Sequence, residues 1–160
     1  MKKYTNSFSR AIIILLAFVL ASCIIIKPVP GNKYVVLLVN TSDINPGADP
    51  KDFCSFPVQH GVSDSEYKTH VFRGDHVAWM GLSTTSADDE VVIESIILDE
   101  DPGTLGLTDG VNDLQGQNGV VNGTISEDAK RGKVPYFIEF TVITEDGSNT
   151  FTLDPILRVH

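Results

Sequence analysis

Imidazole and thiol side chains are the groups in this chain with the chemistry to bind a transition metal or to carry electrons. His70 and His76 flank a turn, and their rings would approach each other if the strands on either side of that turn paired. Cys54, between two phenylalanines in the segment DFCSF, is a further candidate ligand or redox group. The alternative is that the histidines face solvent and the thiol is buried as a small apolar group. A metal or redox site at His70, His76 and Cys54 is therefore one hypothesis.

A second group of candidate metal ligands lies in the segment DINPGAD, which begins at Asp43. Its oxygen-bearing side chains, Asp43, Asn45 and Asp49, are separated by single residues or by a Gly bend, a pattern that partly resembles a calcium-binding loop. The twelfth position, where such loops carry a bidentate Glu, is Cys54. A loop built from Asx and Pro turns is therefore the alternative to a calcium site.

Four hydroxyl residues in succession, Ser83 to Ser86, could supply a nucleophile for hydrolysis. Such a nucleophile needs a base and an orienting group, and His60 or His160 would have to reach it from elsewhere in the chain. No G-x-S-x-G segment surrounds the run, and turn formation accounts for it. The residues therefore predict no catalytic site and no cofactor, and a hydrolase is an alternative only if the loops unite these groups.

Net charge restricts the partners available to this chain. Its 160 residues contain 12 Lys and Arg against 21 Asp and Glu, a formal net charge of −9. Nucleic acid binding requires clustered cations, and the only local basic cluster is Lys130, Arg131 and Lys133. The sequence thus argues against nucleic acid as a partner. It also predicts repulsion from anionic lipid headgroups, so residence at a membrane must come from covalent lipid or an inserted segment.

The first 22 residues have the pattern of a secretory signal peptide. Lys2, Lys3 and Arg10 form a basic segment without acids, and an uninterrupted apolar run follows from 11 to 21. The isoleucines at 24–26 extend the apolar stretch to 16 residues. That is shorter than the ~20 residues a membrane span requires, so a cleaved signal is favoured over an uncleaved anchor.

The apolar run ends in Leu20-Ala21-Ser22-Cys23, which resembles the lipobox of bacterial lipoprotein precursors. The resemblance covers only these first 23 residues. It implies that Cys23 receives lipid, becomes the first residue of the mature chain and attaches it to a membrane. Because Ile24 is not acidic, the sorting rule of the best-known bacteria favours the outer membrane. Loss of the leader's three cations takes the net charge to −12.

The sequence after the expected cleavage site predicts a short spacer followed by one β-domain. Residues 23–32 contain two prolines and a glycine, typical of a stiff spacer. Residues 33–160 are long enough for one core and show no sustained helical periodicity. We expect an all-β Greek-key sandwich after an N-terminal signal helix. About seven strands are expected, at 34–39, 68–72, 76–80, 90–98, 120–125, 134–144 and 150–159.

Alternation within the strands predicts which side chains share a face. Trp79 belongs to an inward face, and residues 73–75 turn its strand back on the strand before it. The strand at 90–98 is apolar on both faces and should be central. Its two faces are expected to carry Val91, Ile93 and Ile97 on one side and Val92, Ile96 and Leu98 on the other, and the strand at 134–144 should place Tyr136, Ile138, Phe140 and Val142 together.

Two short segments resemble exported β-sandwich domains of the cupredoxin-like or immunoglobulin-like kind. The segment VFRGDHVAW at 71–79 is similar to a strand, a Gly-Asp turn and a V-x-W strand in cupredoxin-like domains, and FTLDPI at 151–156 is similar to the ending of uncharacterised exported domains. The resemblance implies the fold. Blue-copper sites use two His, one Cys and a Met near the last strands, and the final turn at 144–149 contains none of these.

These observations favour a non-enzymatic, lipid-anchored binding or accessory module of the cell envelope, attached to the membrane through Cys23 and able to contact an envelope protein. A metal-binding or redox domain is the alternative from another class, and an envelope hydrolase is the third.

Replacement of Cys23 by Ser should leave the chain unlipidated, because the thiol is the group that the lipobox presents for acylation. We expect Cys23→Ser to leave the membrane fraction or to accumulate as uncleaved precursor, and mass spectrometry of the wild-type N-terminus to find acylated Cys23. Inhibition of lipoprotein signal peptidase should also leave the precursor uncleaved. A wild-type chain with an unmodified Cys23 thiol would contradict the anchor.

Overall fold

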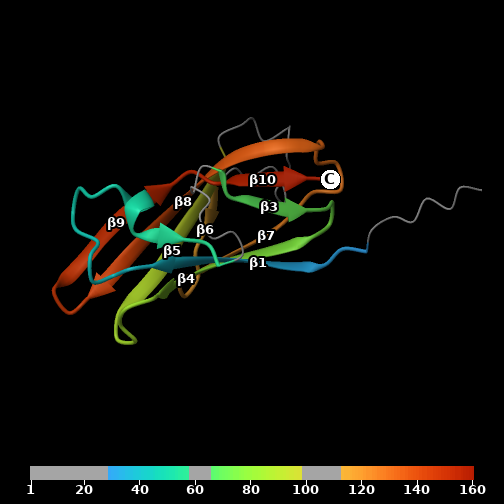
Figure 1. Ribbon diagram of the computed structural model, residues 1–160. Coiled ribbons are helices and arrows are strands. Elements are labelled where there is room, and N and C mark those ends of the chain that lie inside the picture. The colour runs from blue at the N-terminus through green and yellow to red at the C-terminus, as the bar shows by residue number, and fades with distance from the viewer. Residues whose placement is uncertain (1–28, 58–65, 99–112) are drawn as a thin grey trace, which may run out of the picture.

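Two β-sheets packed face to face form the domain (Figure 1). The computed structural model describes residues 29–57, 66–98 and 113–160. The expected signal peptide, Cys23 and His60 lie outside these ranges. Within them, no helix is long and apolar enough to cross a bilayer. The expected all-β sandwich is confirmed.

The smaller sheet has four strands in the order β2-β1-β4-β7. Strand β1 (Asn32–Val39) pairs in parallel with β4 (His76–Ser83) along its whole length, from Asn32 opposite His76 to Val39 opposite Ser83. The short β2 (Cys54–Ser55) and β7 (Val120–Thr124) flank this pair in antiparallel orientation. The parallel pairing places the beginnings of β1 and β4 at one end of the sandwich.

The larger sheet has the order β3-β10-β8-β5-β6, and its axis is the 13-residue β8 (Gly132–Thr144). The first part of β8 pairs with β10 (Ile156–Val159), and its second part pairs with β9 (Gly147–Leu153). The other edge of β8 pairs with β5 (Glu90–Leu98), beside which lies β6 (Asp113–Gln115). Strand β3 (Lys68–Val71) runs parallel to β10.

Ten strands are present in the described residues, rather than about seven. Strands β2 and β6 were not expected because they contain only two and three residues, too few to show periodicity. The last expected strand is divided into β9 and β10 at Asp154 and Pro155. A 3-10 turn, η1 (Pro50–Asp52), lies in the loop before β2.

The core lies between the two sheets and matches the expected alternation in β4 and β8. Trp79 is 0% exposed, and its ring meets the edge of Tyr136 at 6.1 Å between centroids. Tyr136 accepts a 3.3 Å hydrogen bond from Trp79 Nε1. Burial raises the pKa of the Tyr136 phenol far above its ordinary value, because the charged form would lose its hydration. Phe140, also on the inner face of β8, stacks on Phe151 of β9.

The expected faces of β5 are wrong beyond its midpoint. A β-bulge shifts the register between Ile93 and Ser95, so one extra residue enters the strand. Ile96 and Leu98 therefore share the buried side with Val91 and Ile93, and Ile97 faces the other way. Strand β5 does lie between two others, as expected for a strand that is apolar on both faces.

The expected pairing across residues 73–75 is also wrong, because β3 and β4 belong to different sheets. The segment between them is a corner that carries the chain from the larger sheet to the smaller. Gly74 has φ +82°, a conformation that residues with a Cβ rarely adopt. The turn expected at residues 73–75 is therefore present, although the strands on either side of it do not pair.

The bulge in β5 leaves no room for a side chain at Gly116, which follows β6. Gly116 donates its N–H to the Glu94 carbonyl, and a Cβ at this position would overlap the Ile93 carbonyl oxygen. We expect Gly116→Ala to lower the free energy of unfolding by about 1–3 kcal/mol, the usual cost of overpacking. Gly31→Ala, whose Cβ would meet nothing nearer than 3.8 Å, is the control. Equal denaturation midpoints for the two variants would contradict this account of the bulge.

Candidate functional site

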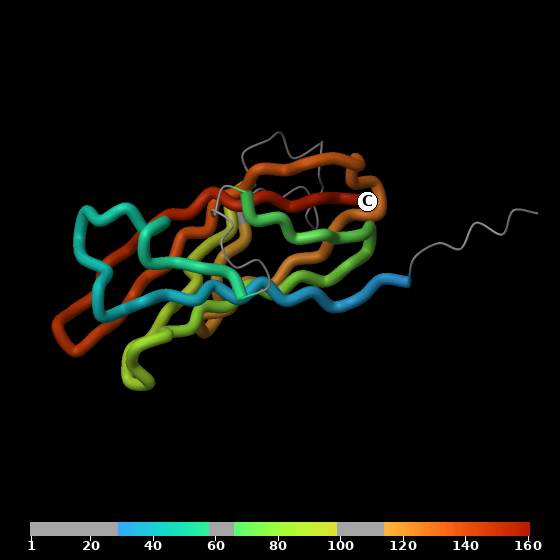
Figure 2. The backbone as a smooth tube through the Cα atoms, viewed as in Figure 1, coloured from blue at the N-terminus to red at the C-terminus, as the bar shows by residue number. Residues whose placement is uncertain are grey.

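The two ends of the sandwich carry different chemistry. We call the end where β1 and β4 begin the entry end, which includes residues 31–33, 72–76, 125–133 and 160. The opposite end, formed by residues 40–46, 83–90 and 144–149, is the far end. Figure 2 shows the first residues of β1 and the C-terminus at one end of the tube and the loops after β1, β4 and β8 at the other.

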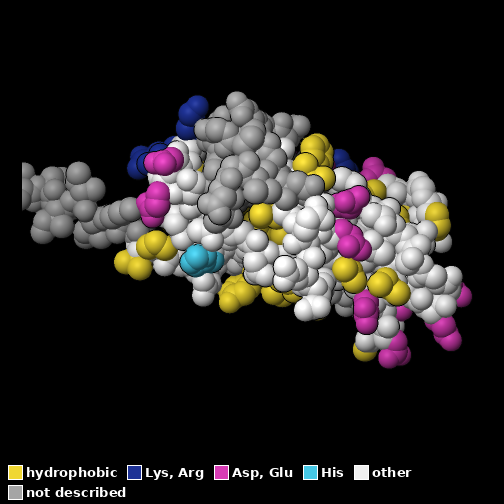
Figure 3. Space-filling model, turned by 180° about the vertical axis from the view of Figure 1, so that it is seen from behind, with side chains coloured by type: hydrophobic (Ala, Val, Ile, Leu, Met, Phe, Trp, Pro, Cys, Tyr) yellow, Lys and Arg dark blue, Asp and Glu magenta, His cyan; other side chains and the backbone are white. Residues whose placement is uncertain are grey.

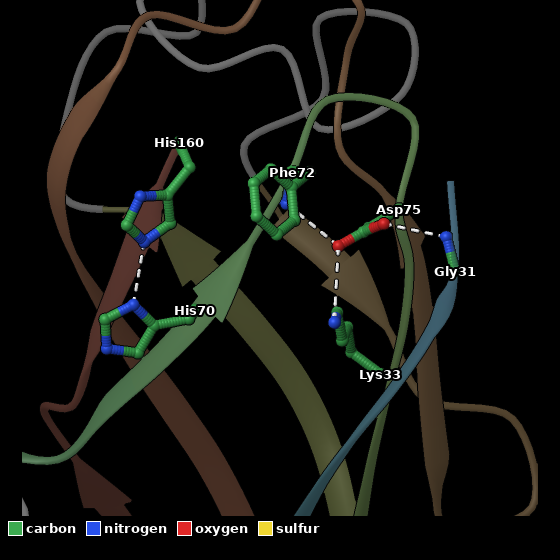
Figure 4. A network of polar contacts seen from close by, with 6 residues as sticks. All are labelled: Gly31, Lys33, His70, Phe72, Asp75 and His160. Carbon is green, nitrogen blue, oxygen red and sulfur yellow. Dashed lines mark hydrogen bonds and ion pairs between the residues drawn. The ribbon is translucent and has the colours of Figure 1, made fainter. Parts of the chain in front are cut away.

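A buried carboxylate organises the entry end (Figure 4). Asp75 is 1% exposed, and its Oδ1 accepts from the Gly31 N–H at 2.8 Å while its Oδ2 accepts from the Phe72 N–H at 2.8 Å. Lys33 Nζ lies 3.9 Å from the same Oδ2. The His76 N–H donates to the Gly31 carbonyl at 2.9 Å. The residue that precedes β1 is thus fixed to the corner between the sheets.

The structure separates the two histidines that the sequence suggested as metal ligands. His70 lies on β3 and His76 on β4, and the two strands are in different sheets. His76 Nδ1 hydrogen-bonds to Thr124 Oγ1 at 2.8 Å. His70 Nδ1 instead meets His160 Nε2 at 2.7 Å, and the two rings stack at 5.0 Å between centroids (Figure 4). One of these nitrogens donates and the other accepts.

The candidate calcium ligands form hydrogen bonds that stabilise turns within their own loop. The Asp43 carboxylate accepts from Asn40 Nδ2 at 2.8 Å, and Asn45 Nδ2 donates to the Asp43 carbonyl at 2.8 Å. Asp49 caps η1 by accepting from the Lys51 N–H at 3.1 Å. Cys54 begins β2, is partly buried and packs against the core. In the described ranges, no group of three or more His, Cys, Asp or Glu side chains has a geometry that could hold a metal ion.

A buried hydroxyl network joins two loops at the far end. Thr41, only 4% exposed, donates to Asp89 Oδ2 at 2.5 Å. Its Oγ1 also lies 2.8 Å from Ser83 Oγ and 3.0 Å from Thr85 Oγ1. A hydroxyl has one proton and two lone pairs, so these three contacts satisfy Thr41 completely. The sequence identified the hydroxyl run at 83–86 but missed Thr41 and Asp89, because cross-strand partners 48 residues apart leave no local signal.

A pocket of about 410 Å³ opens beside this network. Ile44, Pro46 and Phe151 supply apolar surface, and three carboxylates line it as well. These are Asp89, Glu145 and Asp146. His70, His76 and His160 belong to the entry end, so the far-end hydroxyls and carboxylates have none of these imidazoles beside them.

Comparisons with protein-family models and with curated proteins give no match for this chain. Among solved structures, the chain is similar to the inclusion body protein PixA from Burkholderia cenocepacia J2315, with a TM-score of 0.53 and 14% identity over 84% of this chain and 99% of that one. A laccase from B. aclada matches with a TM-score of 0.36 and 12% identity over 80% of this chain and 29% of the laccase. The likeness to the inclusion body protein is one of fold alone.

Asp75→Asn tests the entry-end network. The amide keeps the size of the side chain but turns an NH₂ group toward one of the two N–H donors, which leaves a buried donor unsatisfied. We expect the free energy of unfolding to fall by about 2 kcal/mol or more. Asp128→Asn, an exposed change at the same end, should stay within about 0.5 kcal/mol of wild type. Chemical denaturation measures both, and an unchanged Asp75→Asn protein would contradict the role given to this carboxylate.

Proposed function

We propose that the protein is a lipid-anchored, non-enzymatic binding module of the cell envelope, held at the outer membrane through Cys23, and that its far end binds a basic envelope protein. The observation that carries this proposal is the placement of two features at opposite ends. The chain that follows the lipobox enters the fold at the entry end, and the acidic pocket opens at the far end.

The charge of the far end supports a basic partner. Its three segments, 40–46, 83–90 and 144–149, contain six carboxylates and no Lys or Arg. Charges of one sign around a pocket attract the opposite charge and raise the rate of encounter with it. The apolar surface of Ile44, Pro46 and Phe151 would bury nonpolar side chains of the same partner. The pocket therefore suits a basic segment that also carries hydrophobic residues.

The order of the far-end loops also supports a binding role. Loops at the end of a sandwich are the positions from which such domains usually contact ligands. Here the loop after β1 is fixed to the loop after β4 by the Thr41 contacts to Ser83, Thr85 and Asp89. A binding surface that is fixed before the partner arrives loses less conformational entropy on association.

The distance between the far-end hydroxyls and the three histidines that the structure describes favours binding over hydrolysis. A hydroxyl nucleophile needs a base within hydrogen-bond reach. Ser83 ends β4 and His76 begins it, so the two lie about 23 Å apart along an eight-residue strand. His70 and His160 lie at the same end as His76. Turnover of an ester, peptide or glycan substrate by the purified mature protein would contradict this part of the proposal.

Site-specific photo-crosslinking tests the partner. A photoreactive residue at position 42 or 149, both lining the pocket, should give one adduct with a basic envelope protein in intact cells, and position 122 on the outer face of β7 should not. Reversal of two rim charges, Glu145→Lys with Asp146→Lys, should reduce the adduct about fivefold or more, because the partner would lose two attractive contacts and meet two repulsive ones.

The matched control for this experiment is Glu127→Lys with Asp128→Lys, which makes the same change in net charge at the entry end. It should leave the far-end adduct unchanged. An adduct that both double variants weaken equally would indicate an effect of overall charge and contradict a far-end site. An acidic protein in the adduct would contradict the basic partner.

A further inference from the structure

Basic side chains form a continuous row on the outer face of the larger sheet at the entry end. Lys133 of β8, Arg158 of β10 and His70 of β3 are direct cross-strand neighbours. His160 follows β10 and stacks on His70, which places it on the same side, and the exposed Arg131 directly precedes β8. We call these five residues the basic face.

Among the described residues, the charge of the basic face is not offset by acidic neighbours on the same face. Neighbouring strands lie about 4.8 Å apart, and like charges directly opposite each other on a sheet are unfavourable. The outward neighbours of these residues are Pro135 of β8, Ile156 of β10, Lys68 of β3 and Phe72, which follows β3. None of them is a carboxylate. Arg131 and Lys133 are exposed, and among the described residues no carboxylate forms an ion pair with Arg131, Lys133 or Arg158. This arrangement suits an anion that is not part of the domain.

We propose that the basic face binds the phosphate groups of anionic lipids in the membrane that holds the acyl chains of Cys23. This inference rests on the proposed lipid anchor. Asn32 is the ninth residue after Cys23, so the tether reaches at most about 30 Å, and the domain cannot leave the layer next to the headgroups. A tethered surface meets its ligand at a high effective concentration, so even weak contacts become occupied.

The entry of the chain is next to the basic face. Gly31 is fixed by Asp75, and Lys33 Nζ lies 5.9 Å from the centre of the Phe72 ring. The Phe72 ring is in turn 5.4 Å from the ring of His160, which belongs to the basic face (Figure 4). Lys33, two residues after Gly31, is therefore two side-chain contacts from His160 of the basic face. A lipid anchor that enters there brings this side of the domain to the bilayer first.

The expectation that anionic headgroups repel this protein was based on its net charge, and the distribution of charge supports the opposite proposal for the entry end. Of the eight Lys and Arg residues in the described ranges, five lie in the entry-end segments and a sixth, Arg158, is the cross-strand neighbour of Lys133. The same segments contain three carboxylates: Asp75, which is buried, and Glu127 and Asp128. Figure 3 shows most of the visible Asp and Glu side chains gathered toward the opposite end. Because the Debye length is about 8 Å in physiological salt, the acids at the far end contribute little to the potential at the basic face. The entry end is therefore cationic on its surface, although the net charge of the whole chain is negative.

Lysine footprinting of the lipidated full-length protein in vesicles tests the proposal. Zwitterionic phosphatidylcholine vesicles are compared with vesicles that also contain phosphatidylglycerol, and the rate of amine modification is measured by mass spectrometry. We expect Lys130 and Lys133 to react about fivefold more slowly with anionic vesicles, an effect of the size given by one basic residue at an anionic surface. Added salt should remove the difference. Lys51, which lies in the loop between β1 and β2, serves as the internal reference and should react equally in both.

A charge reversal isolates the basic face from the lipid anchor. Lys133→Glu with Arg158→Glu should abolish the protection of Lys130 and leave flotation with both kinds of vesicle unchanged, because the acyl chains remain. Lys51→Glu, a reversal outside the face, should keep the protection. Circular dichroism of each variant confirms that it is folded.

The possible results separate this inference from the proposed function. A wild-type protein that does not float with zwitterionic vesicles would contradict the lipid anchor. A protein that floats but shows equal protection of Lys130 and Lys133 in the two kinds of vesicle would contradict only the basic face. Protection by inorganic phosphate in detergent, without anionic vesicles, would assign the face to a free anion and overturn the lipid proposal.

Discussion

The constraint on which this structure depends is the burial of one carboxylate at the corner between the two sheets. Asp75 leaves water and is stabilised there because each of its oxygens accepts a backbone N–H and because an ammonium group lies close by. The two donors come from segments 41 residues apart, Gly31 before β1 and Phe72 after β3. One side chain thus joins the smaller sheet, the larger sheet and the point where the N-terminal chain enters the fold.

Because the N-terminal chain enters the fold at a fixed point, the two ends of the sandwich are distinguished by their distance from that point. The parallel pairing of β1 with β4 carries the chain from the Asp75 corner to the Thr41 network, so the two ends are joined by continuous strands. Cations gather at the first end and carboxylates at the second. In the proposed account, the first end faces anionic lipid and the second faces a basic protein partner. Both proposed interactions depend on this separation of positive and negative charge between the two ends. The net charge of the whole chain does not show that separation.

Features that depend on local alternation could be predicted from the sequence, and features that depend on register could not. Trp79, Tyr136 and Phe140 are buried as expected, because burial repeats every second residue in a strand. The bulge after Ile93 reversed the later part of β5, since one inserted residue exchanges the two faces without changing the composition. Two contacts join residues that are far apart in the sequence: His70 with His160, 90 positions apart, and Thr41 with Asp89, 48 positions apart. A local sequence pattern cannot predict such contacts.

Amide hydrogen exchange at Gly31 and Phe72, in the full-length protein on vesicles, tests most directly whether the chain enters the fold at a fixed point. Each of these amides donates to Asp75, so it can exchange only when the corner opens. The account predicts protection comparable to that of the amides in the middle of β1. Exchange at the rate of an unstructured peptide would mean that the N-terminal chain is not fixed where it meets the domain. It would contradict the orientation on which both proposals depend.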